Sequence, residues 1–206
     1  MNVLVIGATG QTGGLAIKKL LAQGHTVTAY ARNPAAITEK HERLKVARGD
    51  ARDQDALHEA LKGQDAVLSA LGPRGLKRDD LQEAFMRGLI GAMKSSGVKR
   101  LVNLSAWGAG DSHKDAMLVF KIAKATVLRH VFADKDRGEA LLFASDVDYV
   151  NVRPGRLLNA PARGGVKASL EPKGIKAELT RDDLADFMIA QLASPTWARK
   201  SPLIGY

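Results

Sequence analysis

The sequence predicts an α/β fold of the Rossmann type, a doubly wound parallel sheet in a single domain with a small excursion. Short apolar runs typical of buried strands alternate along the chain with segments of helical periodicity. A glycine-rich turn, GATGQTGG at residues 7–14, joins the first strand to the first helix. The length of 206 residues suits one domain with a sizeable core and is marginal for two.

The first half of the chain contains four of the predicted strands. The continuous apolar run NVLVI at 2–6 is typical of a strand buried on both faces. A helix follows the glycines, and Gly24 is a suitable residue to end it. The pattern continues with strands at 26–31, 44–50 and 65–72, a short amphipathic helix at 53–62 and a long helix that ends near Gly97.

The second half continues the alternation and then breaks it. We expect a strand at 99–106, a well-buried helix at 116–132, a further helix at 136–145 and a sixth strand at 148–155. Residues 155–179 are rich in glycine, proline and basic residues, and we expect them to form an excursion of the same domain, covering residues 1–206, on the side of the substrate. Thr180 followed by Asp183 marks the start of a last helix.

Composition limits the classes of partner. The net charge of +9 suits a phosphorylated cofactor, an acidic substrate or nucleic acid, and it suits equally a surface that only keeps the protein in solution. Aromatic residues are only 5% and do not interleave with a basic run, so we expect no nucleic acid. No apolar run reaches membrane-spanning length and no secretory leader is visible, which predicts a cytoplasmic protein that does not bind membranes.

Several kinds of chemistry are disfavoured as well. The chain has no cysteine, which excludes disulfides and thiolate nucleophiles. Its five histidines lack metal-ligand spacing, so we expect no metal. It contains no G-x-S-x-G motif of a serine hydrolase.

The glycine turn is the strongest functional signal. Its spacing is Gly7-x-x-Gly10-x-x-Gly13, between a buried strand and an amphipathic helix. Glycine lets the backbone approach a ligand closely, and a helix N-terminus offers free N–H groups and partial positive charge to a phosphate. We therefore expect a dinucleotide pyrophosphate here, although glycines also serve ordinary tight turns.

The end of the second strand predicts which dinucleotide binds. NAD-specific folds place an acidic residue there for the ribose hydroxyl, whereas this strand continues into Arg32 and Asn33. An arginine pairs with a 2′-phosphate, which favours NADP(H), unless Arg32 is simply solvated. Asp50, after the third strand, is placed either to accept from the adenine amine or to stabilise a turn.

Taken together, the motifs resemble a known family. GATGQTGG, ARNP at 31–34, GD at 49–50, SALG at 69–72, NLSAWGAGDS at 103–112 and DYVNVRPGRL at 148–157 are similar, in order, to the atypical short-chain dehydrogenase/reductases of the NAD(P)H-binding type, and among them to the biliverdin and flavin reductases. The resemblance covers nearly the whole chain, including TRDDLADFM near its end.

This resemblance implies roles for individual residues. Around the pyrophosphate it places Gly7, Thr9, Gly10, Gln11, Thr12 and Gly13. Arg32 meets the 2′-phosphate, Asp50 and Ala51 flank the adenine, and Leu71 and Gly72 line the path of the ribose. At the nicotinamide it places Ser105, Ala106, Pro154 and Gly155, with Trp107 bordering the substrate pocket.

One expected catalytic group is missing. The main branch of short-chain dehydrogenases uses Ser, Tyr and Lys, with tyrosine as the general acid for a carbonyl oxygen. Ser105 and Lys135 are candidates for two of these positions, but the residue four before Lys135 is Val131. Both candidates have structural alternatives, since Ser105 could cap a turn and Lys135 could be a solvated helix residue.

The missing acid favours acceptors that do not need one. Flavins, quinones and linear tetrapyrroles spread the charge that hydride transfer develops, so solvent can supply the proton. We therefore expect an NADPH-dependent reductase of a small aromatic or conjugated molecule, as a monomer or homodimer. Arg156 and other basic residues of the excursion could attract acidic groups of that acceptor, and they are explained equally well as a solvated loop. An NADP(H) sensor without turnover remains open, and an NAD(P)-dependent epimerase is a further alternative.

Overall fold

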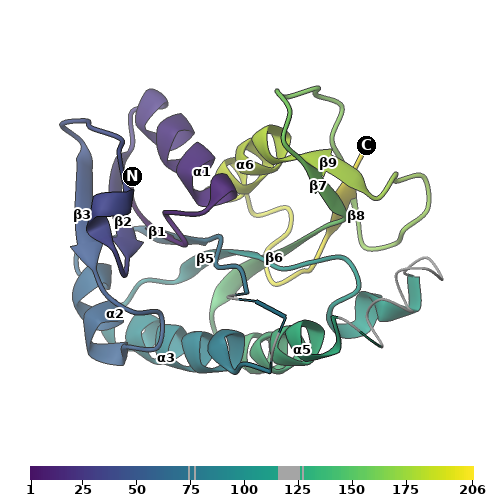
Figure 1. Ribbon diagram of the computed structural model, residues 1–206, viewed down its shortest axis with the longest axis horizontal. Helices are drawn as coiled ribbons and strands as arrows, with labels where there is room; N and C mark the ends of the chain where they lie inside the picture. The colour runs from purple at the N-terminus through teal and green to yellow at the C-terminus, as the bar shows by residue number, and fades with distance from the viewer. Residues whose placement is uncertain (74, 77, 116–125, 127) are drawn as a thin grey trace.

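The fold is built on one eight-stranded sheet (Figure 1). The computed structural model describes residues 1–73, 75–76, 78–115, 126 and 128–206. The strands lie in the order β3-β2-β1-β4-β5-β6-β10-β8. Their bounds are β1 Asn2–Ile6, β2 Thr26–Ala31, β3 Leu44–Arg48, β4 Ala66–Ser69, β5 Arg100–Leu104, β6 Asp148–Pro154, β8 Lys167–Ser169 and β10 Leu203–Gly205. All neighbours pair in parallel except β8, which is antiparallel to β10.

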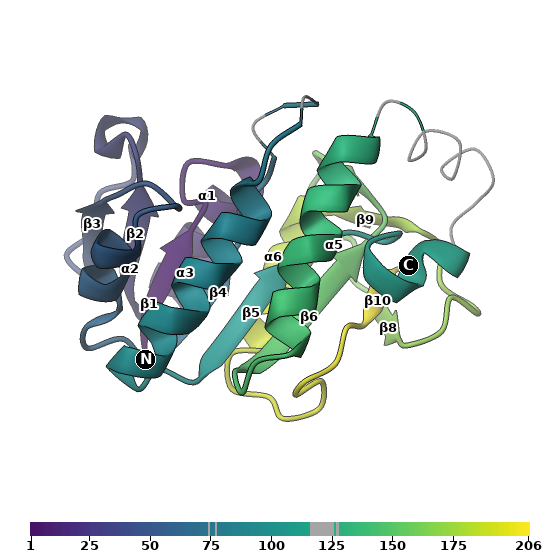
Figure 2. The same cartoon turned by 90° about the horizontal axis from the view of Figure 1, so that it is seen from below.

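Helices cover both faces of the sheet (Figures 1 and 2). One face carries α1 (Gln11–Ala22) and α6 (Arg181–Ala190), and the other carries α2 (Gln54–Leu61), α3 (Leu81–Ser96) and α5 (Arg129–Phe143). The central strand β1 sends Val3 and Val5 into the first core, while Leu4 and Ile6 enter the second. This strand, apolar from Val3 to Ile6, is therefore buried from both sides, as the run NVLVI predicts.

The predicted Rossmann-type fold is confirmed, with differences near its ends. Helix α5 begins at Arg129, seven positions before the expected start at 136, whereas most of the expected helix at 116–132 lies outside the described residues. The strand β10 was not predicted, because its three residues are too few to show a pattern. The antiparallel edge strand β8 likewise departs from a purely parallel sheet.

The excursion at 155–179 has structure of its own. Strands β7 (Arg156–Leu158) and β9 (Glu178–Thr180) pair in parallel as a small second sheet, and β8 lies between them in sequence. Short 3-10 turns, η1 (Pro34–Ala36) and η2 (Gly110–Asp115), follow β2 and β5. Helix α6 starts as expected, with the Thr180 hydroxyl accepting the Asp183 N–H at 3.1 Å. In the described part of the chain, no helix is both long and apolar enough to span a membrane.

Candidate nucleotide-binding site

A cavity opens where the chain reverses direction across the sheet. Strands β2 and β4 pair with opposite sides of β1, so the crevice beyond the carboxyl ends of β1 and β4 is the topological switch point where such folds bind ligands. A cavity of about 290 Å³ occupies this place. Its lining comprises Ile6, Gly7, Thr9, Gly10, Tyr30, Ala31, Arg32, Gly49, Ala51, Ala70, Leu71, Gly72, Pro73 and Leu81.

The glycine loop packs tightly against its own backbone and against the end of β4. Gly7 has a φ of +78°, and a Cβ there would lie 2.5 Å from the carbonyl oxygen of Ala70 on the neighbouring strand. A Cβ on Gly13 would overlap the Gly7 carbonyl. Gly10 donates its N–H to that same carbonyl at 2.9 Å. Gly13 is thus explained by the packing of α1 on the loop, and Gly7 and Gly10 are the two of these glycines that line the cavity.

The first turn of α1 suits an anion. Gly10 is the N-cap and provides no side-chain acceptor, and the first turn carries no acidic residue. By helix geometry the N–H groups of Gln11, Thr12 and Gly13 lack intrahelical acceptors. Free donors together with the positive end of the helix dipole fit the pyrophosphate of a dinucleotide. The roles of these residues in binding it stay predictions.

The predicted adenosine end of the cavity is built by β2 and the turn after β3. Arg32 is exposed on the cavity wall, and no hydrogen bond or ion pair engages it within the part of the chain that the structure describes. The Tyr30 hydroxyl donates to the Asp50 carbonyl at 2.8 Å. Burial, together with the nearby Asp53 and Asp50, raises the pKa of Tyr30 to about 12, so this phenol stays protonated.

Asp50 does not lie on the cavity wall, whereas its neighbours Gly49 and Ala51 do. The Asp50 carboxylate accepts the Arg52 N–H at 3.0 Å, as an aspartate in a turn does. The structure therefore supports the turn role of Asp50, and its contact with adenine stays a prediction. Tyr30 and Gly49 were missed by sequence reasoning, because the tight approach of this ring to Gly49 is visible only across two strands.

The predicted nicotinamide end lies at the ends of β5 and β6, outside that cavity. The Ser105 N–H donates to the Val152 carbonyl and the Trp107 N–H to the Pro154 carbonyl, both at 2.8 Å. These bonds bring Ser105 and Ala106 beside Pro154 and Gly155 at one edge of the sheet.

Gly155, Trp107 and Arg156 were predicted to contact the nicotinamide or the substrate, and the structure places each of them differently. A Cβ on Gly155 would overlap the Ala177 carbonyl, so this glycine is required by the approach of the excursion. Trp107 is buried, and Arg156 is exposed on β7. Neither of them lines the cavity at β1 and β4, and their contact with a substrate stays a prediction.

Behind Ser105 lies a polar cluster that the sequence did not reveal. The Ser105 hydroxyl donates to Glu139 Oε1 at 2.5 Å, and Asn151 Nδ2 donates to the same oxygen at 2.8 Å. Arg153 completes the cluster with a 2.6 Å bond from Nη2 to Glu139 Oε2. The signal was present as polar residues spaced two apart, N-L-S at 103–105 and N-V-R at 151–153, which place their side chains on one face of adjacent strands.

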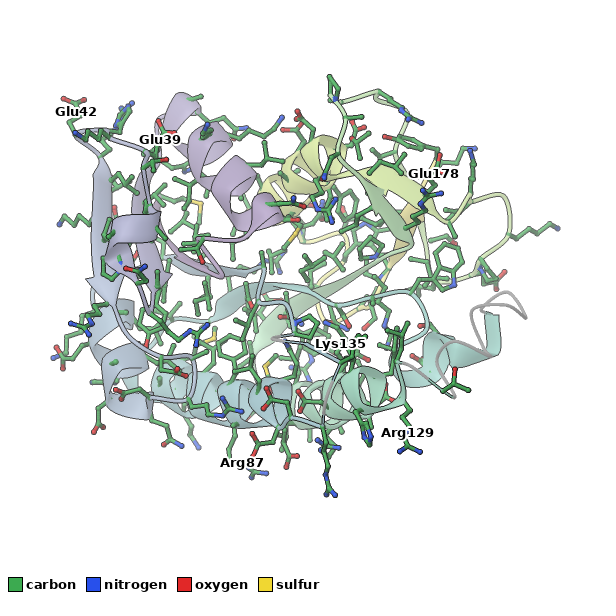
Figure 3. The ribbon with its side chains drawn as sticks, in the orientation of Figure 1. Glu39, Glu42, Arg87, Arg129, Lys135 and Glu178 are labelled. Carbon is green, nitrogen blue, oxygen red and sulfur yellow. The ribbon has the colours of Figure 1, made fainter. Side chains whose placement is uncertain are left out.

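Lys135 lies one turn before Glu139 on α5. Figure 3 shows it on the inner side of this helix, while Arg129 points away from the sheet. It makes no hydrogen bond or ion pair among the described residues. Lys135 is half-buried in the protein. This burial lowers the pKa of Lys135, although the nearby carboxylates of Glu139, Asp134 and Asp136 act to raise it. The solvated-helix alternative for Lys135 therefore loses support.

Three known proteins are similar to this chain over nearly its whole length. A Bacillus subtilis protein that is named an uncharacterized sugar epimerase is 28% identical to this chain over 207 residues. The match covers 93% of this chain and 88% of the Bacillus protein. The anaerobilin reductase ChuY from Escherichia coli O157:H7 superimposes with a TM-score of 0.84 at 23% identity, covering 100% of this chain and 97% of that chain. A short-chain dehydrogenase/reductase of Veillonella parvula, solved with NADP, gives 0.79 at 20% identity, covering 100% and 94%.

These structural similarities establish the fold. Some other curated relatives are longer, and the chain aligns with only 35% of their length. The profile of the NAD(P)H-binding family matches residues 7–195, which include the glycine loop, β5, β6 and α6. The chain therefore belongs to the NAD(P)H-binding family.

Proposed function

We propose that this protein is an NADPH-dependent reductase that transfers hydride to a planar conjugated acceptor, a flavin, a quinone or a linear tetrapyrrole. The observation that supports this most is where the three tyrosines lie. The Tyr30 hydroxyl is bonded under the adenosine end, Tyr149 packs against Phe143 with ring centroids 5.5 Å apart, and the Tyr206 hydroxyl donates to Asp183 at 2.6 Å. None of them is available as an acid beside Ser105.

Residues of this chain would hold NADPH along the carboxyl edge of the sheet. The loop at Gly7 and Gly10 and the N-terminus of α1 bind the pyrophosphate, and Arg32 binds the 2′-phosphate. Bound NADPH supplies the hydride from its nicotinamide ring. The ends of β5 and β6 at Ser105 and Pro154 orient the two rings against each other, which supplies the proximity that the reaction needs.

The proton follows a separate route. A conjugated acceptor delocalises the charge that it receives, so no strong acid has to be positioned, and water can protonate the product. Lys135, on the inner side of α5 and one turn before Glu139, would attract an anionic ligand or product. We assign it this electrostatic role in place of the proton donor of tyrosine-containing relatives.

The names of relatives support the proposal unequally. The anaerobilin reductase is by its name a reductase, and it has almost the same length as this chain. The Bacillus relative is called a sugar epimerase, which keeps the epimerase alternative in the test.

NADPH oxidation followed by absorbance, with riboflavin, menadione, biliverdin and a simple ketone side by side, tests the proposal. We expect turnover with at least one conjugated acceptor and little or none with the ketone. Robust ketone reduction with inert conjugated acceptors would refute the proposed mechanism. Tight NADPH binding with no turnover of any acceptor would instead indicate a sensor.

A further inference from the structure

The hydroxyl proton of Ser105 already forms a hydrogen bond within the protein. The Ser105 Oγ to Glu139 Oε1 distance of 2.5 Å is that of a charge-assisted O–H···O⁻ bond. Ser105 is 7% exposed and Glu139 is 4% exposed, so water competes little for this bond. The hydroxyl must be the donor, because a carboxylate can only accept.

Glu139 is held as a carboxylate by a buried arginine. Arg153 is 3% exposed and donates to Glu139 Oε2 at 2.6 Å and to Asp111 Oδ1 at 2.6 Å. Gly110 covers this pair, since a Cβ at that glycine would overlap both the Glu139 carboxylate and the Arg153 guanidinium. A paired, covered carboxylate has no room to turn away from Ser105.

The strands support the same arrangement from below. Asn103 on β5 is the register partner of Asn151 on β6, and its Nδ2 donates to Asn151 Oδ1 at 2.8 Å. This bond fixes the Asn151 amide so that its own Nδ2 points to Glu139 Oε1. Glu139 Oε1 thus accepts from Ser105 and Asn151, and also from Arg153 Nε at 3.3 Å, so side chains of β5 and β6 jointly determine its orientation.

A hydroxyl has one hydrogen and two lone pairs. With the hydrogen bonded to Glu139, the Ser105 oxygen can offer only lone pairs to a ligand at the end of β5. Turning the hydrogen toward a substrate carbonyl would leave the buried carboxylate without one of its donors, which is costly at a buried site. Ser105 therefore accepts, and a ligand atom facing it must donate.

We propose that Glu139, held by Arg153, is a positioning residue that fixes the Ser105 hydroxyl as a hydrogen-bond acceptor toward the bound acceptor molecule. The inference rests on the proposed function, which places the acceptor at Ser105. It narrows the acceptor to a planar heterocycle with a ring N–H, as in an imide or lactam. A quinone, which presents only carbonyl oxygens, gains nothing from Ser105.

Two flavins that differ in one group test this directly. Lumiflavin has an imide N–H, and 3-methyllumiflavin has a methyl group in its place. With NADP⁺ bound, flavin fluorescence titration should show that the parent protein binds lumiflavin about 2- to 10-fold more tightly, the scale of one neutral hydrogen bond. Ser105→Ala should bring this ratio close to 1 without breaking the Glu139–Arg153 pair.

Glu139→Gln separates positioning from plain support of the fold. It removes the carboxylate that takes the Ser105 proton, so the ratio should fall toward 1 although Ser105 is present. The matched control is Thr28→Val, which removes a buried hydroxyl that is bonded to Gln64 on the other side of the sheet from this cluster's strands, and it should keep the parent ratio. Thermal melts identify variants that fail to fold, and if Glu139→Gln is one of them, the Ser105→Ala ratio decides.

Equal binding of the two flavins by the parent protein, or an unchanged ratio in Ser105→Ala, would overturn the inference. Turnover of menadione without binding of either flavin would also overturn it while leaving the proposed function intact. A clear N–H preference in binding without any turnover would support the inference and count against the reductase.

Discussion

Arg32 is the residue on which the choice between the two nicotinamide cofactors depends. It lies on the cavity wall and is not engaged by another group of the described chain. A charge-assisted hydrogen bond to the 2′-phosphate should favour NADPH over NADH by about 1–3 kcal/mol, roughly 5- to 150-fold in Kd. Arg32→Ala should remove most of this preference in fluorescence titrations with both cofactors.

The control for this change is Arg48→Ala. Arg48 is exposed at the end of β3 and does not line the cavity, so the same loss of charge there should leave the preference almost unchanged. Equal affinity of the parent protein for NADPH and NADH would rule out the role of Arg32.

The lowered pKa of Lys135 predicts how the free energy of unfolding depends on pH. Because burial lowers its pKa below the ordinary 10.5, the unfolded chain binds more protons than the folded one between the lowered pKa and 10.5. The free energy of unfolding therefore rises with pH in that window, and the cost of the buried charge is present in full below it. Lys135→Met should raise the free energy of unfolding at pH 7 by about 0.5–2 kcal/mol, as for other functional residues held at a cost.

Urea unfolding of both proteins at pH 7 and pH 10 measures this. The stabilisation should be larger at pH 7, and NADPH turnover should fall in the variant. The control Lys18→Met removes an amine with a 67% exposed side chain and should change stability little at either pH. A Lys135→Met protein that is less stable at pH 7 would show that the lysine is a structural partner.

At the scale of elements, Asp183 at the start of α6 connects the excursion at 155–179 to the rest of the domain through hydrogen bonds. The Asp183 carboxylate accepts from the Arg163 and Gly164 N–H groups at 2.8 and 3.1 Å. It also accepts from the Thr180 and Tyr206 hydroxyls at 2.7 and 2.6 Å. Burial by itself raises the pKa of Asp183, but these four hydrogen bonds outweigh it and lower the pKa to about 2.

Asp183→Asn should therefore destabilise the fold by about 1.5–3 kcal/mol, the scale of hydrogen bonds to a charged group. A lowered carboxyl pKa contributes stability that is complete above the unfolded value near 3.8 and is lost as pH falls toward 2. Thermal melts at pH 7 and pH 2.5 should thus differ less in the variant than in the parent. Asp182→Asn, at a partly exposed neighbour paired with Lys19, is the matched control and should cost little.

The same scale shows what sequence alone could reach. Apolar runs such as residues 2–6 and 66–69 identify central strands, because strands buried on both faces must be apolar throughout or nearly so. Three-residue strands such as β10 and β7 are too short to show an alternation of apolar and polar residues, and pairing with neighbouring strands determines their conformation. The glycine loop and Arg32 were visible because they are contiguous with β1 and β2. The Glu139–Arg153 pair was not, since nothing in the sequence pairs residues on different elements.

At the scale of the whole molecule, strand order decides where chemistry can occur. The reversal at β1 and β4 opens the cavity, and β5 and β6 extend the same edge toward Ser105. Two apolar cores, one under each layer of helices, pack the sheet that carries this edge. The division of 1–206 as one domain and a monomeric or dimeric state stay predictions, as does the cytoplasmic location.

Hydride transfer from NADPH to a conjugated acceptor is the central claim, and deuterium at C4 of the nicotinamide tests it most directly. Single-turnover stopped-flow would compare NADPH with NADPH deuterated at both C4 positions, using the best conjugated acceptor from the panel. We predict that deuteration slows the oxidation step clearly, because one of the two deuterons is transferred as hydride while the other stays at C4 of the NADP⁺ that forms. Oxidation at the same rate with both cofactors would contradict the claim.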